Sequence, residues 1–231
     1  MNDVYIWSIP LSEEASGPGD ACLLNDEERA RAARFYFDRD SRRYTVGRAT
    51  LRRILSYYIG LPPAALSFIY NPFGKPALLP EQNPNGLEFN LSHTGDHALC
   101  AVTFGHAVGL DLEAIKPLDY LQLAGSVFSP REQTILRELS VTEQPQAFFN
   151  GWTRKEAYIK AHGKGLSMPL TEFDVTLAPG EPARLLATRP DPAEANRWSL
   201  FGWSVGTDLV AALAVAGHDW QLVHRNSSEL Q

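Results

Sequence analysis

A single segment limits the fold of this chain more than any other. Residues 152–165 read WTRKEAYIKAHGKG, in which a helix-forming run is followed by two glycines, so the segment predicts a helix that ends near Gly163. With about 3.6 residues per turn, Trp152, Glu156 and Lys160 fall on one stripe of that helix. An indole, a carboxylate and an ammonium therefore face the same neighbouring element.

Two further carboxylates lie upstream in a segment with the period of a strand. Residues 107–113 read AVGLDLE, in which apolar residues alternate with glycine, Asp111 and Glu113. Both acidic side chains point the same way and lie roughly 6.5–7 Å apart. Magnesium prefers such oxygen ligands and keeps positions for water and substrate phosphate. With Glu156, the segment predicts a magnesium site for diphosphate chemistry.

Each motif also has an ordinary structural explanation. An Asp-x-Glu pattern at a strand end is often solvated, and a Glu-to-Lys pair one helical turn apart is often a surface ion pair worth well under about 1 kcal/mol. Two other segments make the functional interpretation the better one. Residues 71–78 read NPFGKPAL, where Gly74 allows close approach of a ligand and Lys75 offers a charge for phosphate. Residues 89–93 read FNLSH, a strand with two polar side chains on one face.

Taken in order, these motifs resemble those of the 4'-phosphopantetheinyl transferases of the surfactin-synthetase-activating (Sfp) type. The shared patterns are Gly-Lys-Pro, Phe-Asn-x-Ser-His, Gly-x-Asp-x-Glu and Trp-x-x-Lys-Glu-Ala-x-x-Lys-x-x-Gly-x-Gly-Leu, over about residues 25–175. The resemblance implies two similar α/β halves related by pseudo-twofold symmetry, with coenzyme A between them. It also implies transfer of phosphopantetheine from coenzyme A to a serine of an apo acyl or peptidyl carrier protein, with magnesium as cofactor and 3',5'-ADP as product.

The resemblance assigns roles residue by residue. Asp111, Glu113 and Glu156 match the magnesium ligands, and Glu156 and Lys160 the catalytic pair. The remaining matches are to residues that contact coenzyme A. Arg31 and Arg43 match contacts near its phosphates, and Gly74, Lys75 and Pro76 match contacts on the adenine side. Asn90, Ser92 and His93 also match phosphate contacts, and Asp111 and Lys160 match contacts to the diphosphate. The early basic stretch departs from the pattern, because Glu28 stands where some relatives carry a further lysine.

The chemistry leaves alternatives open. Attack on phosphorus depends mainly on positioning and on neutralisation of charge. Glu156 is a candidate base for the serine proton, but a neighbouring metal and Lys160 both favour its ionised form and weaken it as a base, so a metal-bound water is an equal candidate. A coenzyme A or nucleotide binding module and a magnesium-dependent nucleotide diphosphate hydrolase are the rival functions.

Composition restricts the remaining possibilities. The chain has 231 residues, 44% of them hydrophobic, and a net charge of −6, which disfavours nucleic acid as a partner. We expect a cytoplasmic protein without membrane contact, because the sequence lacks a signal segment and any apolar run near 18 residues. We also expect a monomer. Cys22 and Cys100 are too few for a disulfide scaffold, and we expect both to be reduced and buried.

The pattern along the chain predicts an α+β sandwich-like fold with a boundary between residues 1–105 and 106–231. Capping signals at Asn25 and Ser129 predict helix starts, with the first helical region reaching Ile59 after a break near Asp40. Predicted strands cover 4–9, 66–70, 87–91, 98–104, 173–177, 184–186, 198–204 and 209–216, in addition to the strand at Val108.

Overall fold

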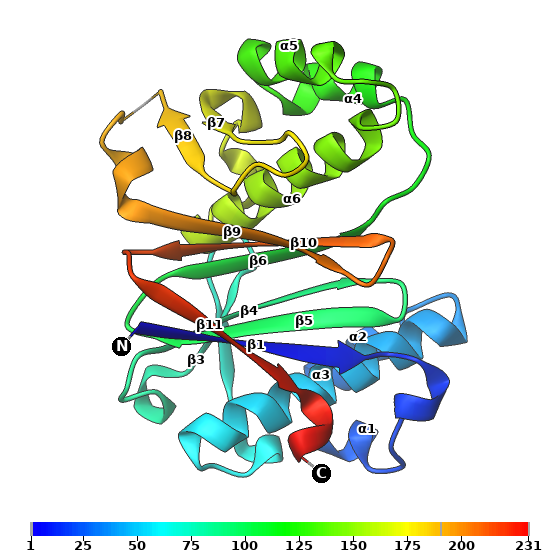
Figure 1. Ribbon diagram of the computed structural model, residues 1–231. Helices are drawn as coiled ribbons and strands as arrows, with labels where there is room; N and C mark the ends of the chain where they lie inside the picture. Colours follow the sequence, from blue (N-terminus) through cyan, green and yellow to red (C-terminus); the bar gives the residue numbers. More distant parts are fainter. Residues whose placement is uncertain (1, 190, 231) are drawn as a thin grey trace.

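Two β-sheets stack face to face at the centre of the molecule, and each carries a long helix on its outer side (Figure 1). The computed structural model describes residues 2–189 and 191–230, and the side chain of Leu166 also lies outside the described part. The strands of these sheets are β1 (Asn2–Pro10), β4 (Leu87–Thr94), β5 (His97–Phe104), β6 (Val108–Ala114), β9 (Trp198–Val205), β10 (Leu209–Ala216) and β11 (Trp220–Asn226). The first sheet has the order β11-β1-β5-β4, and the second has the order β6-β10-β9.

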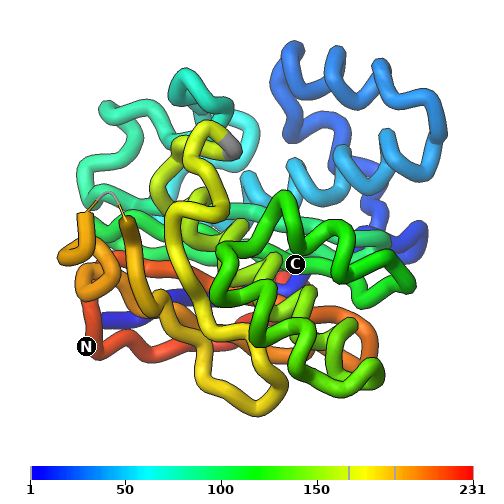
Figure 2. The backbone as a smooth tube through the Cα atoms, turned by 90° about the horizontal axis from the view of Figure 1, so that it is seen from above, coloured from blue at the N-terminus to red at the C-terminus, as the bar shows by residue number. Residues whose placement is uncertain are grey.

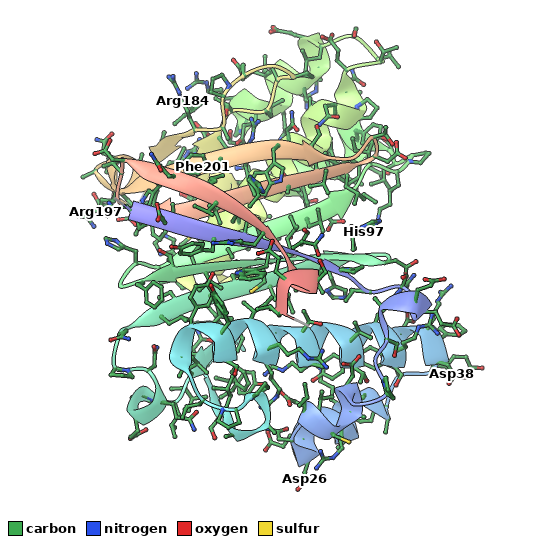
Figure 3. The ribbon with its side chains drawn as sticks, turned by 60° about the horizontal axis from the view of Figure 1, so that its bottom comes forward. Asp26, Asp38, His97, Arg184, Arg197 and Phe201 are labelled. Carbon is green, nitrogen blue, oxygen red and sulfur yellow. The ribbon has the colours of Figure 1, made fainter. Side chains whose placement is uncertain are left out.

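Helices and two small hairpins complete the fold. The helices are α1 (Asp20–Leu23), α2 (Asp26–Ala32), α3 (Asp38–Ile59), α4 (Tyr120–Val127), α5 (Pro130–Glu138) and α6 (Gln144–His162). The hairpins pair β2 (Phe68–Tyr70) with β3 (Pro76–Leu78), and β7 (Phe173–Val175) with β8 (Leu185–Thr188). Seen from above, α2 and the start of α3 project beyond the sheets on one side (Figure 2). Asp26 and Asp38 mark that end, whereas Arg184 and Arg197 lie on the opposite side of the sheets (Figure 3).

The interface between the sheets is apolar. Val4, Ile6, Leu99 and Ala101 of the first sheet pack in one cluster with Val108, Leu110, Leu112, Ala211, Leu213 and Val215 of the second. All of these side chains are at most 4% exposed. Because both faces of β10 are covered, its sequence LVAALAVA is a continuous apolar run instead of an alternating one.

Polar side chains join the sheets along one edge. β4 and β6 are edge strands of their respective sheets. The backbone N–H of Leu110 donates to Asn90 Oδ1 at 2.8 Å, and the N–H of Leu112 donates to Ser92 Oγ at 3.2 Å. Side chains of the first sheet therefore satisfy donors on the free edge of the second, which would otherwise be buried without partners.

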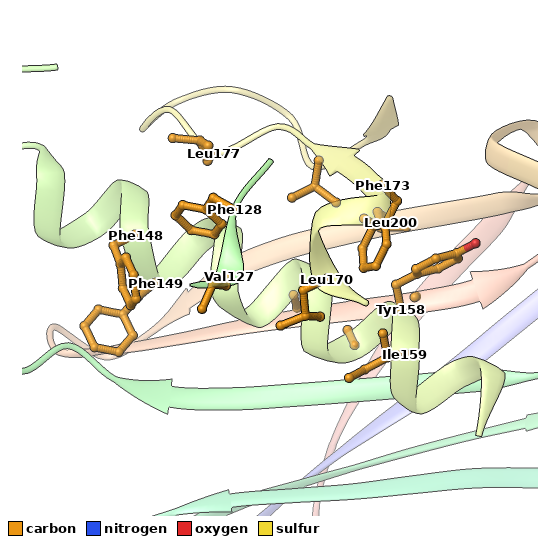
Figure 4. Packing of buried hydrophobic residues seen from close by; sticks show 14 of the residues in the cluster. Val127, Phe128, Phe148, Phe149, Tyr158, Ile159, Leu170, Phe173, Leu177 and Leu200 are labelled. Atoms are coloured by element: carbon orange, nitrogen blue, oxygen red, sulfur yellow. The ribbon is translucent and has the colours of Figure 1, made fainter. Parts of the chain in front are cut away.

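Helix α6 lies on the outer face of the second sheet and organises the larger core (Figure 4). Tyr158 and Ile159 are 1% exposed and pack with Leu170, Phe173 and other apolar residues. The helix ends at Gly163, which is left-handed with φ 68°, a conformation that glycine adopts without steric cost.

A buried ion pair anchors the outer side of α6. Lys155 Nζ lies 2.8 Å from Glu132 Oε2 and donates to the carbonyls of Leu170 at 2.7 Å and Phe173 at 2.6 Å. Burial lowers the pKa of Lys155 and raises the pKa of Glu132, while each partner favours the charged form of the other. The pair fastens the start of α5 and strand β7 to α6.

The expected α+β class is confirmed, and so are both capping signals. Asn25 and Ser129 each form a complete capping box with the glutamate three residues later. The break in the first helical region falls between Ala32 and Asp38. The strand expected from residue 66 begins only at Phe68, and β11 and α4 were not predicted. The expectation that both cysteines are buried is wrong for Cys22, which is exposed.

The domain boundary near residue 105 stays a prediction. Strand β11, from the end of the chain, pairs in parallel with β1 and so belongs to the first sheet. Among the described residues, no helix is long and apolar enough to cross a membrane.

Candidate functional site

A cavity of about 650 Å³ opens between α3, the β4–β5 turn and the loop before β3. Its lining combines cations with aromatic rings, the groups that suit a nucleotide with its phosphates. The charged and aromatic members are Arg31, Phe35, Asp40, Arg43, Tyr44, Arg48, Tyr70 and His93. Arg31 also lies over the ring of Tyr44, with 5.3 Å between the guanidinium carbon and the ring centroid.

Most of the sequence-predicted coenzyme contacts of the first half meet at this cavity. Arg31, Arg43, Gly74, Pro76, Asn90 and His93 all line it. Lys75 does not, because its Nζ donates to the carbonyls of Val108 and Ala161 instead. Ser92 points from β4 toward β6, where its hydroxyl donates to Asp111 and accepts from the backbone N–H of Leu112.

Several lining residues were missed from the sequence. Tyr44, Arg48 and Tyr70 belong to the cavity wall, and Arg48 Nη2 donates to the Tyr70 hydroxyl at 3.0 Å. A signal existed for the first two, because Tyr44, Arg48 and Leu51 recur at helical spacing beside the predicted Arg43. Tyr70 comes from a separate hairpin and had no local signal.

Glu28 is part of the fold and not a phosphate contact. It is 3% exposed and accepts hydrogen bonds from Arg48 and, at 2.8 Å, from Arg52. Burial raises the pKa of Glu28, but Arg48, the Asn25 backbone and Arg52 outweigh it and hold the pKa below its usual range. The carboxylate therefore fixes Arg48 at the cavity wall.

The carboxylate cluster forms where β6 crosses α6. The two elements pack closely at Gly109, because a Cβ built there would lie 2.1 Å from the Ala157 carbonyl oxygen. Lys160 Nζ lies 2.6 Å from Asp111 Oδ1 and 3.2 Å from Ser92 Oγ. The predicted stripe of α6 thus faces the predicted carboxylate strand.

Asp111 has one oxygen engaged and one free. Its Oδ1 accepts from Lys160 and, at 3.1 Å, from Ser92 Oγ. Its Oδ2 is buried without a hydrogen-bond partner. A buried carboxylate oxygen without a partner is costly, so this atom is the natural acceptor for a further ligand.

The other two carboxylates carry raised pKa values. Burial, followed by repulsion from Asp111 and Glu113 and despite Lys160, raises the pKa of Glu156 to about 6. Burial and Asp111 likewise raise the pKa of Glu113, against the effects of Lys116, a hydrogen bond with Trp152, and Lys160. The negative charges of Asp111, Glu113 and Glu156 therefore repel one another, and Lys160 only partly offsets this repulsion.

The donor set fits a hard divalent cation, although the described residues hold no ready-made cluster of three or more metal-binding side chains. The carboxylate oxygens are of the type that magnesium prefers, and Asp111 Oδ2 is free. A cation bound by one or two of these carboxylates and by phosphate oxygens would relieve the repulsion that raises the pKa of Glu156.

The cavity and the carboxylate cluster adjoin through β4. Asn90 lines the cavity while its Oδ1 bonds β6, and Ser92, two residues on, bonds Asp111. Desolvation, followed by the charges of Lys160 and Arg43, lowers the pKa of His93, although this residue remains exposed overall. His93 thus lines the cavity and also lies close enough to Lys160 for that charge to affect it.

A cationic cavity therefore lies beside a group of carboxylates, an arrangement that suits a phosphate-bearing ligand. Residues 107–214 match the model of the 4'-phosphopantetheinyl transferase superfamily, and residues 19–104 match the model of the 4'-phosphopantetheinyl transferase N-terminal region. Together these matches include β4 and β5 of the first sheet and β6, β9 and most of β10 of the second, but not β1 or β11.

Curated relatives carry the name 4'-phosphopantetheinyl transferase. The chain is 43% identical to 4'-phosphopantetheinyl transferase HetI of Nostoc sp., over 95% of this chain and 90% of that protein. It is 34% identical to 4'-phosphopantetheinyl transferase Sfp of Bacillus subtilis, over 73% and 72%, and 33% identical to a putative 4'-phosphopantetheinyl transferase of Synechocystis sp., over 84% and 77%. The chain belongs to the 4'-phosphopantetheinyl transferase superfamily and is therefore a group-transfer enzyme.

Proposed function

We propose that this protein transfers the phosphopantetheine arm of coenzyme A to a serine hydroxyl of an apo acyl or peptidyl carrier protein. The observation that carries the proposal is the position of Lys160, which joins Asp111 and Ser92 beside the cationic cavity. The family supports it, since the relatives are named for this transfer. Which carriers are served, whether of fatty-acid, polyketide or nonribosomal-peptide type, is an outcome of the test.

Coenzyme A would place its nucleotide in the cavity. Among the residues that line it, Arg31 and Arg43 would supply charge for the phosphates, Gly74 and Pro76 would border the adenine, and Tyr44 would offer an aromatic face. The diphosphate would then extend past His93 and Asn90 toward Lys160. In this arrangement Lys160 lies where negative charge develops on the leaving phosphate.

Asp111, Glu113 and Glu156 would hold magnesium together with phosphate oxygens. A bound magnesium ion supplies neutralisation of the diphosphate charge. The residues of the chain supply position: Lys160 and Ser92 fix Asp111 Oδ1 and leave Oδ2 free, and Trp152 contacts Glu113. This division keeps one oxygen of Asp111 available for the cation.

The reaction is a displacement at phosphorus. The carrier serine Oγ forms a bond to the phosphorus that carries pantetheine, and the bond from that phosphorus to the bridging oxygen breaks. The bridging oxygen leaves with the electron pair as part of 3',5'-ADP, and the serine proton passes to Glu156 directly or through a water. Because its pKa is about 6, Glu156 is mostly ionised at neutral pH and able to accept that proton.

Mass spectrometry of a panel of apo carriers tests the proposal. Incubation with coenzyme A and magnesium is expected to add the mass of phosphopantetheine to at least one carrier, with one 3',5'-ADP released per event. Release of 3',5'-ADP without a carrier would instead support a hydrolase. Binding of coenzyme A without either product would support a binding module.

A further inference from the structure

The loop between β2 and β3 reaches across to the second sheet. Asn71 shapes this loop, because its Oδ1 accepts from the backbone N–H groups of Phe73 and Lys75, both at 2.9 Å. The loop turns at Gly74, whose φ of 85° is easily adopted only by glycine. Lys75 is thereby directed away from the cavity that its neighbours Gly74 and Pro76 line.

The side chain of Lys75 joins the two elements that carry the acidic cluster. Its Nζ donates to the carbonyl of Val108 at 3.0 Å and to the carbonyl of Ala161 at 3.1 Å. Val108 begins β6, three residues before Asp111, and Ala161 directly follows Lys160 in the last turn of α6. Carbonyls in a last helical turn lack partners within the helix, and a cation there is favourable.

A second contact from the same loop holds the end of α6. Asn71 Nδ2 donates to the Gly163 carbonyl at 2.6 Å. A Cβ at Gly163 would lie 2.9 Å from Asn71 Nδ2 and 3.2 Å from Lys75 Cδ, so the helix end and the loop fit together only with glycine there. The loop therefore caps α6 through both its first and its last residue.

We propose that Lys75 is a positioning residue of the transferase: its ammonium holds β6 and α6 in the register in which Asp111, Glu156 and Lys160 meet, and it ties that register to the rim of the nucleotide cavity. The inference rests on the proposed function. It replaces the phosphate contact expected for Lys75 from the sequence.

The environment of Lys75 supports a structural bond over a ligand contact. Two of its three donors are already used by buried backbone oxygens. Burial lowers the pKa of Lys75, and the charge of Glu88 only partly opposes this effect. A phosphate in the cavity would have to compete with both carbonyls for the same ammonium.

Kinetics of Lys75→Met distinguish a positioning role from a direct contact with coenzyme A, since methionine keeps much of the side-chain length and removes the hydrogen-bond donors. We expect kcat for carrier loading to fall at least tenfold at saturating coenzyme A, while the Kd for coenzyme A, measured by calorimetry, changes less than threefold. Lys75→Arg keeps a cation with several N–H donors and should regain part of the lost kcat. The exposed Lys164→Met is the matched control and should stay within twofold of the wild type.

An effect on the Kd for coenzyme A without an effect on kcat would overturn the inference. A Kd for coenzyme A raised tenfold or more in Lys75→Met, with kcat unchanged, would make Lys75 a ligand contact. If Lys75→Met does not fold by circular dichroism, the same comparison of kcat with Kd on Lys75→Arg decides. Wild-type enzyme that loads no apo carrier would overturn the proposed function itself, so the two failures are distinguishable.

Discussion

At the scale of single residues, the site depends on how charge is shared among a few side chains. Lys160 bonds only one oxygen of Asp111, and the second oxygen remains without a partner. Glu156 keeps a pKa of about 6 because burial and two neighbouring carboxylates outweigh Lys160. The carboxylates around Lys160 therefore carry more negative charge than this lysine neutralises, and a bound cation would offset the excess.

Removing the charge of Glu156 should stop the reaction and spare the fold. We expect Glu156→Gln to lower kcat/KM for carrier loading by at least a hundredfold, because the variant loses both a magnesium ligand and the candidate base. The melting temperature should remain at or slightly above the wild-type value, because an unfavourable buried charge is gone. The exposed Glu138→Gln on α5 is the control. Wild-type turnover by Glu156→Gln would count against the site.

Magnesium binding should weaken as the pH falls through 6. The pKa of Glu156 is raised from its ordinary 4.5 to about 6, so protons compete with the cation below that value. For a single proton, the apparent Kd for magnesium should rise roughly tenfold between pH 7 and pH 5. Calorimetric titration with magnesium checks this directly, and a Kd independent of pH would contradict it.

The raised pKa of Glu156 also affects the stability of the metal-free protein. Magnesium binding strengthens as the pH rises, whereas the contribution of Glu156 to folding stability weakens. Between pH 4.5 and about 6 the folded state holds a proton on Glu156 that the unfolded state has lost. The contribution of this group to stability therefore decreases as the pH rises through that window. Magnesium should restore it, so the rise in melting temperature on adding magnesium should be larger at pH 7 than at pH 5.

At the scale of elements, the close packing of β6 on α6 sets the geometry. Gly109 has no side chain, and this lets the strand approach the helix backbone. Lys75 then donates hydrogen bonds to both elements. Strand and helix act as one unit that carries Asp111, Glu156 and Lys160.

A single methyl group added at Gly109 should push β6 and α6 apart. We expect Gly109→Ala to lower the free energy of unfolding by about 3 kcal/mol or more, because its Cβ would lie 2.1 Å from the Ala157 carbonyl oxygen and 2.2 Å from the Ala161 nitrogen. Gly125→Ala in α4 meets nothing within 4 Å and should instead be neutral or stabilising by about 0.5–1 kcal/mol. Urea unfolding measures both. Equal stability of the two variants would refute the packing argument.

At the scale of the whole molecule, the site exists because two sheets meet along β4 and β6. The nucleotide cavity belongs to the first sheet and its helix, and the acidic cluster to the second sheet and α6. Asn90 and Ser92 bond from one sheet to the other. The alignment of the two half-sites therefore depends on these bonds.

Replacing the amide that joins the sheets should weaken that alignment. Asn90→Leu leaves the Leu110 N–H without its acceptor, and we expect a loss of about 1–3 kcal/mol of unfolding free energy. Hydrogen exchange at the Leu110 amide should be faster than in the wild type. The exposed Asn196→Leu should change stability by less than about 0.5 kcal/mol. Unchanged exchange at Leu110 would show that the bond does not hold the sheets.

The sequence by itself determined the local structure and the types of group at the site. The period of residues 108–113, the stripe of Trp152, Glu156 and Lys160, and the end of the helix at Gly163 are all local patterns, and each is present in the fold. Such patterns are readable because they depend on backbone geometry over a few neighbouring residues.

Only the tertiary structure decided where the side chains go. Lys75 is directed to two backbone carbonyls and not to the cavity, Tyr70 joins Arg48 from a separate hairpin, and β11 returns to pair with β1. Each of these outcomes depends on residues far apart in the chain. A long polar side chain bonds to the donors and acceptors that packing brings within its reach. These partners are distant in the sequence, so no local sequence pattern predicts them.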